Sequence, residues 1–77
     1  MITILFFANI REEVGSEKIE LDVKEMTILQ LKEHLQSMYQ LKSVEHAMTA
    51  INESFVTDDG VVKENDTVAF IPPVSGG

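Results

Sequence analysis

Cysteine is absent from this chain of 77 residues. Neither a disulfide nor a zinc site with thiolate ligands can therefore stabilise it, and it has no cysteine nucleophile. A chain of this length forms one domain, close to the size at which a single hydrophobic core only just suffices. The core must come from the apolar residues, which make up 44% of the sequence.

Basic residues are few, with 6 lysines and arginines against 13 acidic residues and a formal net charge of −7. Nucleic acids need clustered basic side chains, so this charge argues against a nucleic-acid partner. It favours a basic partner, or an acidic surface that only keeps the protein in solution. No apolar run approaches the roughly 20 residues of a membrane span. The start, MITILFFANI, has no basic leader or small-residue cleavage site, so we expect a cytoplasmic protein away from membranes.

The order of apolar and polar residues predicts an α+β fold. Residues 2–8 are typical of a strand, residues 9–17 of a polar loop, and the alternating residues 18–25 of a half-buried strand. Thr27 and Gln30 fit a capping box before a helix from about residue 28 to Tyr39. Two short strands with a turn near residues 52–53, a loop at residues 58–60 and a last strand ending before Pro72 follow. If the last strand pairs beside the first, the result is a β-grasp, a mixed sheet with one main helix on one face.

The first and last strands are too apolar for a sheet that is covered on one face only. Such strands should alternate apolar with polar residues, yet both carry apolar residues on each side. The residues expected to face the helix are Ile2, Ile4, Phe6, Val68 and Phe70. Those expected to face outward are Leu5, Phe7, Ala69 and Ile71, joined by Phe55. This outward patch indicates a partner, unless residues 9–17 or 40–47 fold over it.

The side chains offer no ordinary active site. His34 and His46 have no third ligand at a metal-binding spacing, so both are expected at the surface and no metal site is predicted. The glycines are too scattered to form a phosphate-binding loop. We expect three methionines to fill gaps in the core, namely Met26, Met38 and Met48.

The C-terminal stretch PPVSGG is the remaining candidate. Pro72 and Pro73 favour an extended path away from the sheet. Gly76 and Gly77 have no Cβ and can enter a channel too narrow for other residues. Such a tail can deliver its carboxylate into the active site of another protein. Since a carboxylate is a poor acyl donor, an enzyme must activate it, most simply with ATP as an acyl-adenylate.

Three stretches of the sequence resemble the small, sulfur-carrying subunits of molybdopterin synthase. They are LFFANIREEVG at the start, AINESFV in the middle and VAFIPPVSGG at the end. The resemblance implies a ubiquitin-like β-grasp domain in residues 1–71 and an extended reactive tail in residues 72–77. The chain departs from the family pattern at Ile71, where a phenylalanine is expected, and at residues 64–66, where Glu-Asn-Asp replaces Asp-Gly-Asp.

The resemblance also implies a reaction cycle. A ubiquitin-activating-like enzyme adenylates Gly77 with ATP, sulfur transfer gives a thiocarboxylate, and the tail enters the large synthase subunit. There the sulfur attacks cyclic pyranopterin monophosphate, in a complex of two small and two large chains whose pterin-binding groups belong to the large subunit. No cofactor stays bound to the small chain. The tail residues that enter the partner are Pro72, Pro73, Val74, Ser75 and Gly76. The expected docking residues are Leu5, Phe7, Arg11, Phe55, Ala69 and Ile71.

Other functions remain open at this point. A ubiquitin-like modifier would be joined through Gly77 to lysines of target proteins. A sulfur carrier of the thiazole pathway or of tRNA thiolation would share the Gly-Gly ending. A plain interaction module would use only the outward patch and would not need Gly76 and Gly77.

Overall fold

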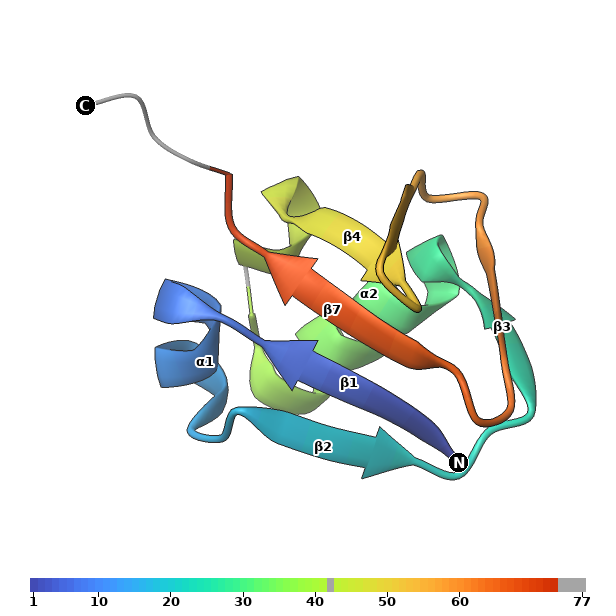
Figure 1. Ribbon diagram of the computed structural model, residues 1–77. Helices are drawn as coiled ribbons and strands as arrows, with labels where there is room; N and C mark the ends of the chain where they lie inside the picture. The colour runs from blue at the N-terminus through green and yellow to red at the C-terminus, as the bar shows by residue number, and fades with distance from the viewer. Residues whose placement is uncertain (42, 74–77) are drawn as a thin grey trace.

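Figure 1 shows the computed structural model of the chain, which describes residues 1–41 and 43–73. A five-stranded sheet has the strand order β2-β1-β7-β4-β5, and β3 and β6 form a separate pair. The elements in chain order are β1 (Ile2–Phe6), α1 (Ala8–Val14), β2 (Lys18–Leu21), β3 (Glu25–Thr27), α2 (Ile28–Tyr39), the 3-10 helix η1 (Ser43–His46), β4 (Met48–Ile51), β5 (Ser54–Val56), β6 (Val61–Lys63) and β7 (Thr67–Ile71).

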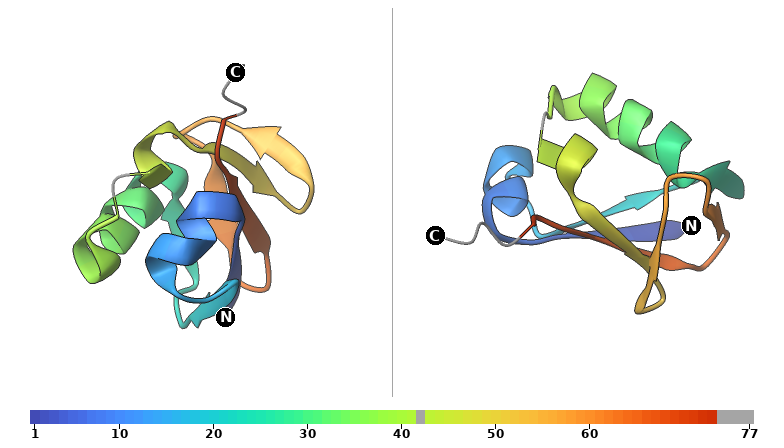
Figure 2. Two further views of the ribbon diagram at one scale, coloured as in Figure 1. Left: turned by 90° about the vertical axis from the view of Figure 1, so that its left-hand side faces the viewer. Right: turned by 90° about the horizontal axis from the view of Figure 1, so that it is seen from above.

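The first and last strands, β1 and β7, lie side by side, as the β-grasp prediction requires, and they run parallel. The other neighbours in the large sheet, β1 with β2, β7 with β4 and β4 with β5, are antiparallel. Parallel strands need a crossover connection. That connection contains α2, which covers one face of the mixed sheet (Figure 2).

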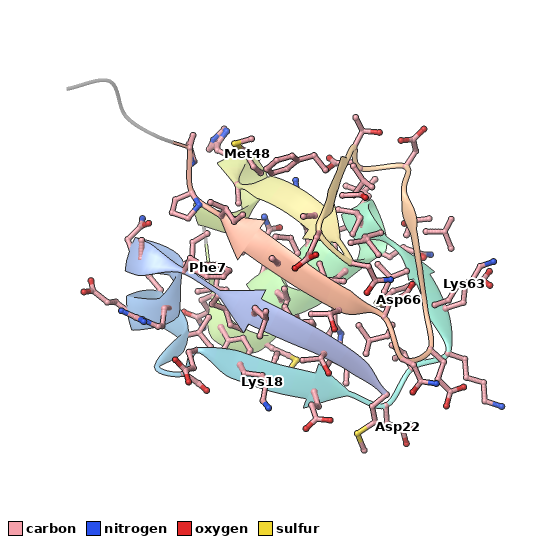
Figure 3. The ribbon with its side chains drawn as sticks, viewed as in Figure 1. Phe7, Lys18, Asp22, Met48, Lys63 and Asp66 are labelled. Atoms are coloured by element: carbon pink, nitrogen blue, oxygen red, sulfur yellow. The ribbon has the colours of Figure 1, made fainter. Side chains whose placement is uncertain are left out.

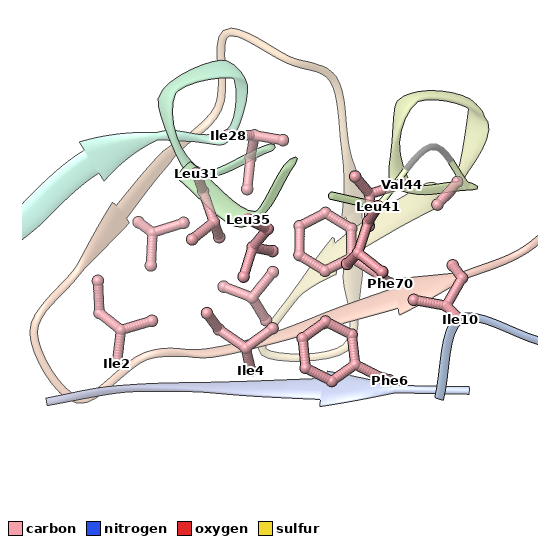
Figure 4. Packing of buried hydrophobic residues seen from close by; sticks show 13 residues of the cluster. Ile2, Ile4, Phe6, Ile10, Ile28, Leu31, Leu35, Leu41, Val44 and Phe70 are labelled. Carbon is pink, nitrogen blue, oxygen red and sulfur yellow. The ribbon is translucent and has the colours of Figure 1, made fainter. Parts of the chain in front are cut away.

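The hydrophobic core fills the space between α2 and the sheet (Figure 4). The rings of Phe6 and Phe70, from the two central strands, stack with their centroids 6.3 Å apart. All the residues predicted to face the helix are at most 2% exposed, namely Ile2, Ile4, Phe6, Val68 and Phe70. Successive residues of a strand point to opposite faces, and this two-residue period predicted the buried face of the two central strands correctly.

The helix α2 begins and ends at the predicted residues. Thr27 Oγ1 accepts a hydrogen bond from the N–H of Gln30 at 3.1 Å, and Gln30 Oε1 accepts one from the N–H of Thr27 at 2.9 Å, which completes the capping box. The N–H of Leu29 donates to the carbonyl of Asp58. Lys32 Nζ donates to the Asp58 carboxylate at 2.8 Å. The two hydrogen bonds to Asp58 tie the start of α2 to the loop before β6.

Part of the predicted polar loop at residues 9–17 is the helix α1, so that prediction is wrong. Ile10 is fully buried, and Val14, four residues later on the same side, packs against the core. Gly15 ends the helix with a φ of 84°, and its N–H donates to the carbonyl of Arg11 at 2.9 Å. Polar residues around Ile10 and Val14 concealed this short helical pattern.

Two of the three methionines expected in the core are exposed. Met38 and Met48 are 48% and 45% exposed, whereas Met26 packs against the core as predicted. In the last turn of α2, Tyr39 and not Met38 packs on the core, because it lies four residues after the buried Leu35.

The strand predicted over residues 18–25 is divided. β2 ends at Leu21, and β3 begins at Glu25 and pairs antiparallel with β6. In this second sheet Met26 is opposite the fully buried Val62, so the pair extends the core beside the start of α2. Each strand has only three residues and its partner is distant in sequence, so the sequence did not predict the pair.

Candidate docking face and C-terminal tail

The face of the sheet turned away from α2, called here the outward face, carries the candidate site. Leu5 of β1 pairs with Ala69 of β7, Ala69 pairs with Ala50 of β4, and Ala50 pairs with Phe55 of β5. These four residues form one row across four strands. In the neighbouring row Met48 pairs with Ile71. Figure 3 looks onto this face and labels Phe7 and Met48 at the end where β7 finishes.

Two small residues make the middle of the outward face concave. Ala50 and Ala69 lie among larger side chains and form the floor of an open hollow of about 570 Å³. Its lining residues are Leu5, Phe7, Ala50, Asn52, Glu53, Phe55, Thr67, Ala69 and Ile71. The residues predicted to face outward are all among them. A shape of this kind accommodates a protruding apolar side chain of another protein.

The outward face is open to solvent. Phe55 is 66% exposed and Phe7 is 43% exposed. Residues 9–17 and 40–47 were the two segments that could have covered this face. Their described parts pack on the other side of the sheet instead, because Ile10 of α1 and Val44 of η1 are fully buried in the core cluster on the side of α2. The described parts of residues 9–17 and 40–47 therefore leave exposed apolar residues on the outward face, which is typical of an interaction surface.

Arg11 lies at the edge of the outward face. A second, smaller hollow of about 240 Å³ shares Leu5 and Phe7 with the first, and Arg11, Glu17 and Lys18 also line it. Arg11 and Lys18 thus place two of the chain's 6 basic residues beside the apolar hollow. Sequence reasoning did not include Lys18, although its place on the polar side of an alternating strand, with Glu20 and Asp22, was a usable sign. The structure pairs Lys18 with Leu5.

Asn52 holds the turn between β4 and β5 against the start of β7. Its N–H donates to the carbonyl of Thr67 at 2.8 Å, and the N–H of Thr67 donates to Asn52 Oδ1 at 3.0 Å. Asn52 Nδ2 donates to Asp66 Oδ1 at 3.0 Å, and the N–H of Lys63 donates to Asp66 Oδ2 at 2.9 Å. The hydrogen bond from Lys63, then that from Asn52, and the charge of Lys63 hold the pKa of Asp66 below its ordinary value.

The predicted tail begins directly after the outward face. Pro72 is half-buried and Pro73 is exposed. The predictions for Val74, Ser75, Gly76 and Gly77 fall outside the described residues and stay predictions. In residues 1–41 and 43–73, no three His, Cys, Asp or Glu side chains form a group that could hold a metal ion. None of the helices in these ranges is long and apolar enough to cross a membrane.

Comparison with known proteins places the chain in a family. Residues 4–77 match the ThiS family. The molybdopterin synthase sulfur carrier subunit of Escherichia coli (strain K12) is 37% identical over 100% of this chain and 100% of that protein.

Two solved structures show the same fold. SAMP1 from Haloferax volcanii is similar over 99% of this chain and 98% of its own length, with a TM-score of 0.81 and 22% identity. A chain from the complex of subunits 1 and 2 of molybdopterin-converting factor from Helicobacter pylori is similar over 99% of this chain and 97% of its own length, with a TM-score of 0.70 and 22% identity. These likenesses show a ubiquitin-like β-grasp fold. Because the sequence match extends over its length, the chain belongs to the ThiS family, within the group of molybdopterin synthase sulfur carrier subunits.

Proposed function

We propose that this chain is the sulfur carrier of a molybdopterin synthase and donates sulfur from a thiocarboxylate at Gly77. The observation that carries the proposal is the identity of 37% to the Escherichia coli sulfur carrier subunit over the full length of both proteins. The open outward face supports it, because a carrier must dock on the enzymes that load and unload it.

The proposed cycle begins with an adenylating enzyme that uses ATP. The carboxylate of Gly77 attacks the α-phosphorus of ATP, pyrophosphate leaves, and an acyl-adenylate forms. A donor of sulfide-level sulfur then attacks the carbonyl carbon of Gly77, AMP leaves, and a thiocarboxylate remains. A thiocarboxylate is more acidic than a thiol and is ionised at neutral pH, so it needs no neighbouring base to act as a nucleophile. The reacting group therefore belongs to the main chain.

In this proposal the outward face docks on the large synthase subunit. β7 ends at Ile71, which lines the hollow, so docking fixes the point from which the tail starts. The tail then reaches the active site of the large subunit, where its sulfur attacks cyclic pyranopterin monophosphate. The groups that bind this pterin belong to the large subunit, and two small and two large chains form the complex. The Helicobacter pylori complex of subunits 1 and 2 supports a partner of this kind.

The fold does not separate a sulfur carrier from a protein modifier. The small archaeal modifier protein 1 of Haloferax volcanii has the same fold, with a TM-score of 0.81 at 19% identity. The higher identity to the sulfur carrier subunits favours sulfur transfer. The two functions also differ in what becomes attached to Gly77, which is sulfur in one case and a target lysine in the other.

The test is the intact mass of the purified chain after incubation with its adenylating enzyme, ATP and a sulfur donor. We expect one oxygen atom of Gly77 to be replaced by sulfur, and the carboxylate to return once the large subunit and the pterin precursor are added. A chain without Gly76 and Gly77 is the control and should stay unchanged. Stable conjugates to lysines of other proteins, with no sulfur incorporated, would show a modifier instead.

A further inference from the structure

Glu53 has an unfavourable backbone conformation at the rim of the outward hollow. Asn52 and Glu53 link β4 to β5 and have φ values of 49° and 72°. Two positive φ values in a hairpin of this length are typical of a type I′ turn, in which glycine is preferred at the second place. Asparagine tolerates this conformation, whereas the Cβ of glutamate crowds the backbone. The chain therefore keeps a side chain where glycine would fit better.

Local structure accounts for two other non-glycine residues with a positive φ. Gln40 is the C-cap of α2, where a left-handed residue is common, and Asn65 is an asparagine in a turn. Ala8 has a φ of 52° and directly follows Phe7, which lines the outward hollow. In the part of the chain that the structure describes, the two positive-φ residues that are neither glycine, asparagine nor a helix C-cap are Ala8 and Glu53, and both adjoin this hollow. Strain of this kind concentrates at functional sites.

Hydrogen bonds, and not the packing of Phe55, hold the turn in this conformation. Asn52 exchanges two hydrogen bonds with Thr67 and donates a third to Asp66. β5 is a three-residue edge strand, and its Phe55 is 66% exposed. The side chain of Glu53 is therefore presented beside Phe55 by a turn that is already hydrogen-bonded to the start of β7 without any partner.

Among the residues that the structure describes, Glu53 is also the one ionisable residue that lines the outward hollow. It is exposed, and the ion pairs found among residues 1–41 and 43–73 join other groups, the N-terminus with Glu64 and Lys32 with Asp58. An unpaired carboxylate beside an apolar hollow is complementary to an apolar side chain that has a lysine or arginine next to it. The net charge of −7 favours a basic partner surface as well.

We propose that Glu53 is a specificity-determining residue of the outward face and binds a lysine or arginine of the large synthase subunit. This cation lies beside the apolar side chain that occupies the hollow. The inference rests on the proposed function, because it takes the large subunit as the partner. A charge pair at the rim of an interface acts on the association rate and rejects partners that carry a negative charge at the same place.

The affinity of the chain for the large subunit from the same organism tests this inference. Glu53→Gln keeps the length of the side chain and removes its charge, so we expect a two- to fivefold loss of affinity and a weaker dependence on salt. Glu53→Lys places like charges together and should lower the affinity about tenfold or more. Glu33→Gln is the matched control. It removes the same charge from an exposed position on α2 and should bind as wild type does.

Glu53→Gly separates the role of the charge from that of the fold. Glycine relieves the strained φ, so the midpoint of thermal unfolding of the Glu53→Gly variant should equal or exceed that of wild type. Its affinity for the large subunit should fall as that of Glu53→Gln does. Wild-type affinity in both Glu53→Gln and Glu53→Lys would overturn the inference and leave the proposed function standing. If the wild-type chain itself does not bind the large subunit, the proposed function fails and the inference fails with it.

Discussion

Asp66 shows how one side chain links two turns of the sheet. One carboxylate oxygen accepts a hydrogen bond from the N–H of Lys63, at the end of β6 where the turn to β7 begins, and the other accepts one from Asn52, in the turn that carries Glu53. Figure 3 labels Asp66 and Lys63 at this end of the outward face. Both bonds favour the ionised carboxylate and lower its pKa, so folding is linked to its ionisation.

Asp66→Asn should lower the midpoint of thermal unfolding at neutral pH and have no such effect in strong acid. The folded state lowers the pKa of Asp66, so its contribution to stability is fully present above the ordinary aspartate pKa of about 4 and is lost as the pH falls through the folded value. Melting curves of both proteins from neutral to acidic pH should therefore converge. A difference that stays constant over this range would contradict the prediction.

The hairpin of β4 and β5 is the element that gives the outward face its rim. β5 pairs only with β4 at the edge of the sheet, and its register places Phe55 opposite Ala50 on the floor of the hollow. An exposed aromatic residue contributes little to the core, whereas at the centre of an interface it commonly accounts for much of the binding energy. Phe55 should therefore matter for docking and not for folding.

Phe55→Ala should change the free energy of unfolding by less than about 0.5 kcal/mol, as surface substitutions usually do. It should weaken binding to the large subunit by about tenfold or more, which corresponds to ~1.4 kcal/mol. Met38→Ala is the matched control, because it removes an exposed apolar side chain on α2, away from the outward face. Urea denaturation and calorimetric titration provide the two measurements. Equal affinity losses in both variants would show that the outward face is not the docking surface.

The whole molecule has a covered side and an uncovered side. α2, α1 and η1 contribute to the core on one side of the sheet, and the other side keeps its apolar residues exposed. The charge is also uneven, since the net charge is −7 while Arg11 and Lys18 both line the smaller hollow. Apolar contact and long-range charge are thus two separable contributions to docking.

Raising the ionic strength should slow association with the large subunit more than it changes dissociation. Between ~0.15 M and ~1 M salt the screening length falls from about 8 Å to about 3 Å, which removes long-range attraction between the acidic chain and a basic partner. Contacts in the apolar hollow are not screened, so they persist. Stopped-flow measurements at both salt concentrations give the association and dissociation rates. The variant for comparison is Phe55→Ala, which should mainly raise the dissociation rate. An association rate independent of salt would contradict the role given to the net charge.

The local structure followed from the sequence because it depends on neighbouring residues. The capping box of Thr27 and Gln30 fixed the start of α2, and the two-residue period of a strand separated the buried face from the outward face in residues 2–6 and 67–71. The outward orientation of Leu5 was predicted for the same reason, and Phe55 was added to that face from its place just after the turn. The short helix α1 was missed because its apolar pattern has only two members, Ile10 and Val14.

The tertiary structure alone decided how these faces assemble into a site. Ala50 and Ala69 form the floor of the hollow, and Asn52 reaches Asp66, only because β4 pairs with β7 in one register. A shift of that register by one residue would turn Ala50 toward α2 and a core residue toward solvent. Residues 72–77 are the reverse case, since their proposed chemistry follows from the glycines and the terminal carboxylate. The sequence by itself thus determined α2, the two central strands and the proposal of a reactive end. The pairing of distant strands decided the shape of the docking surface, because register is set by contacts between residues far apart in the chain.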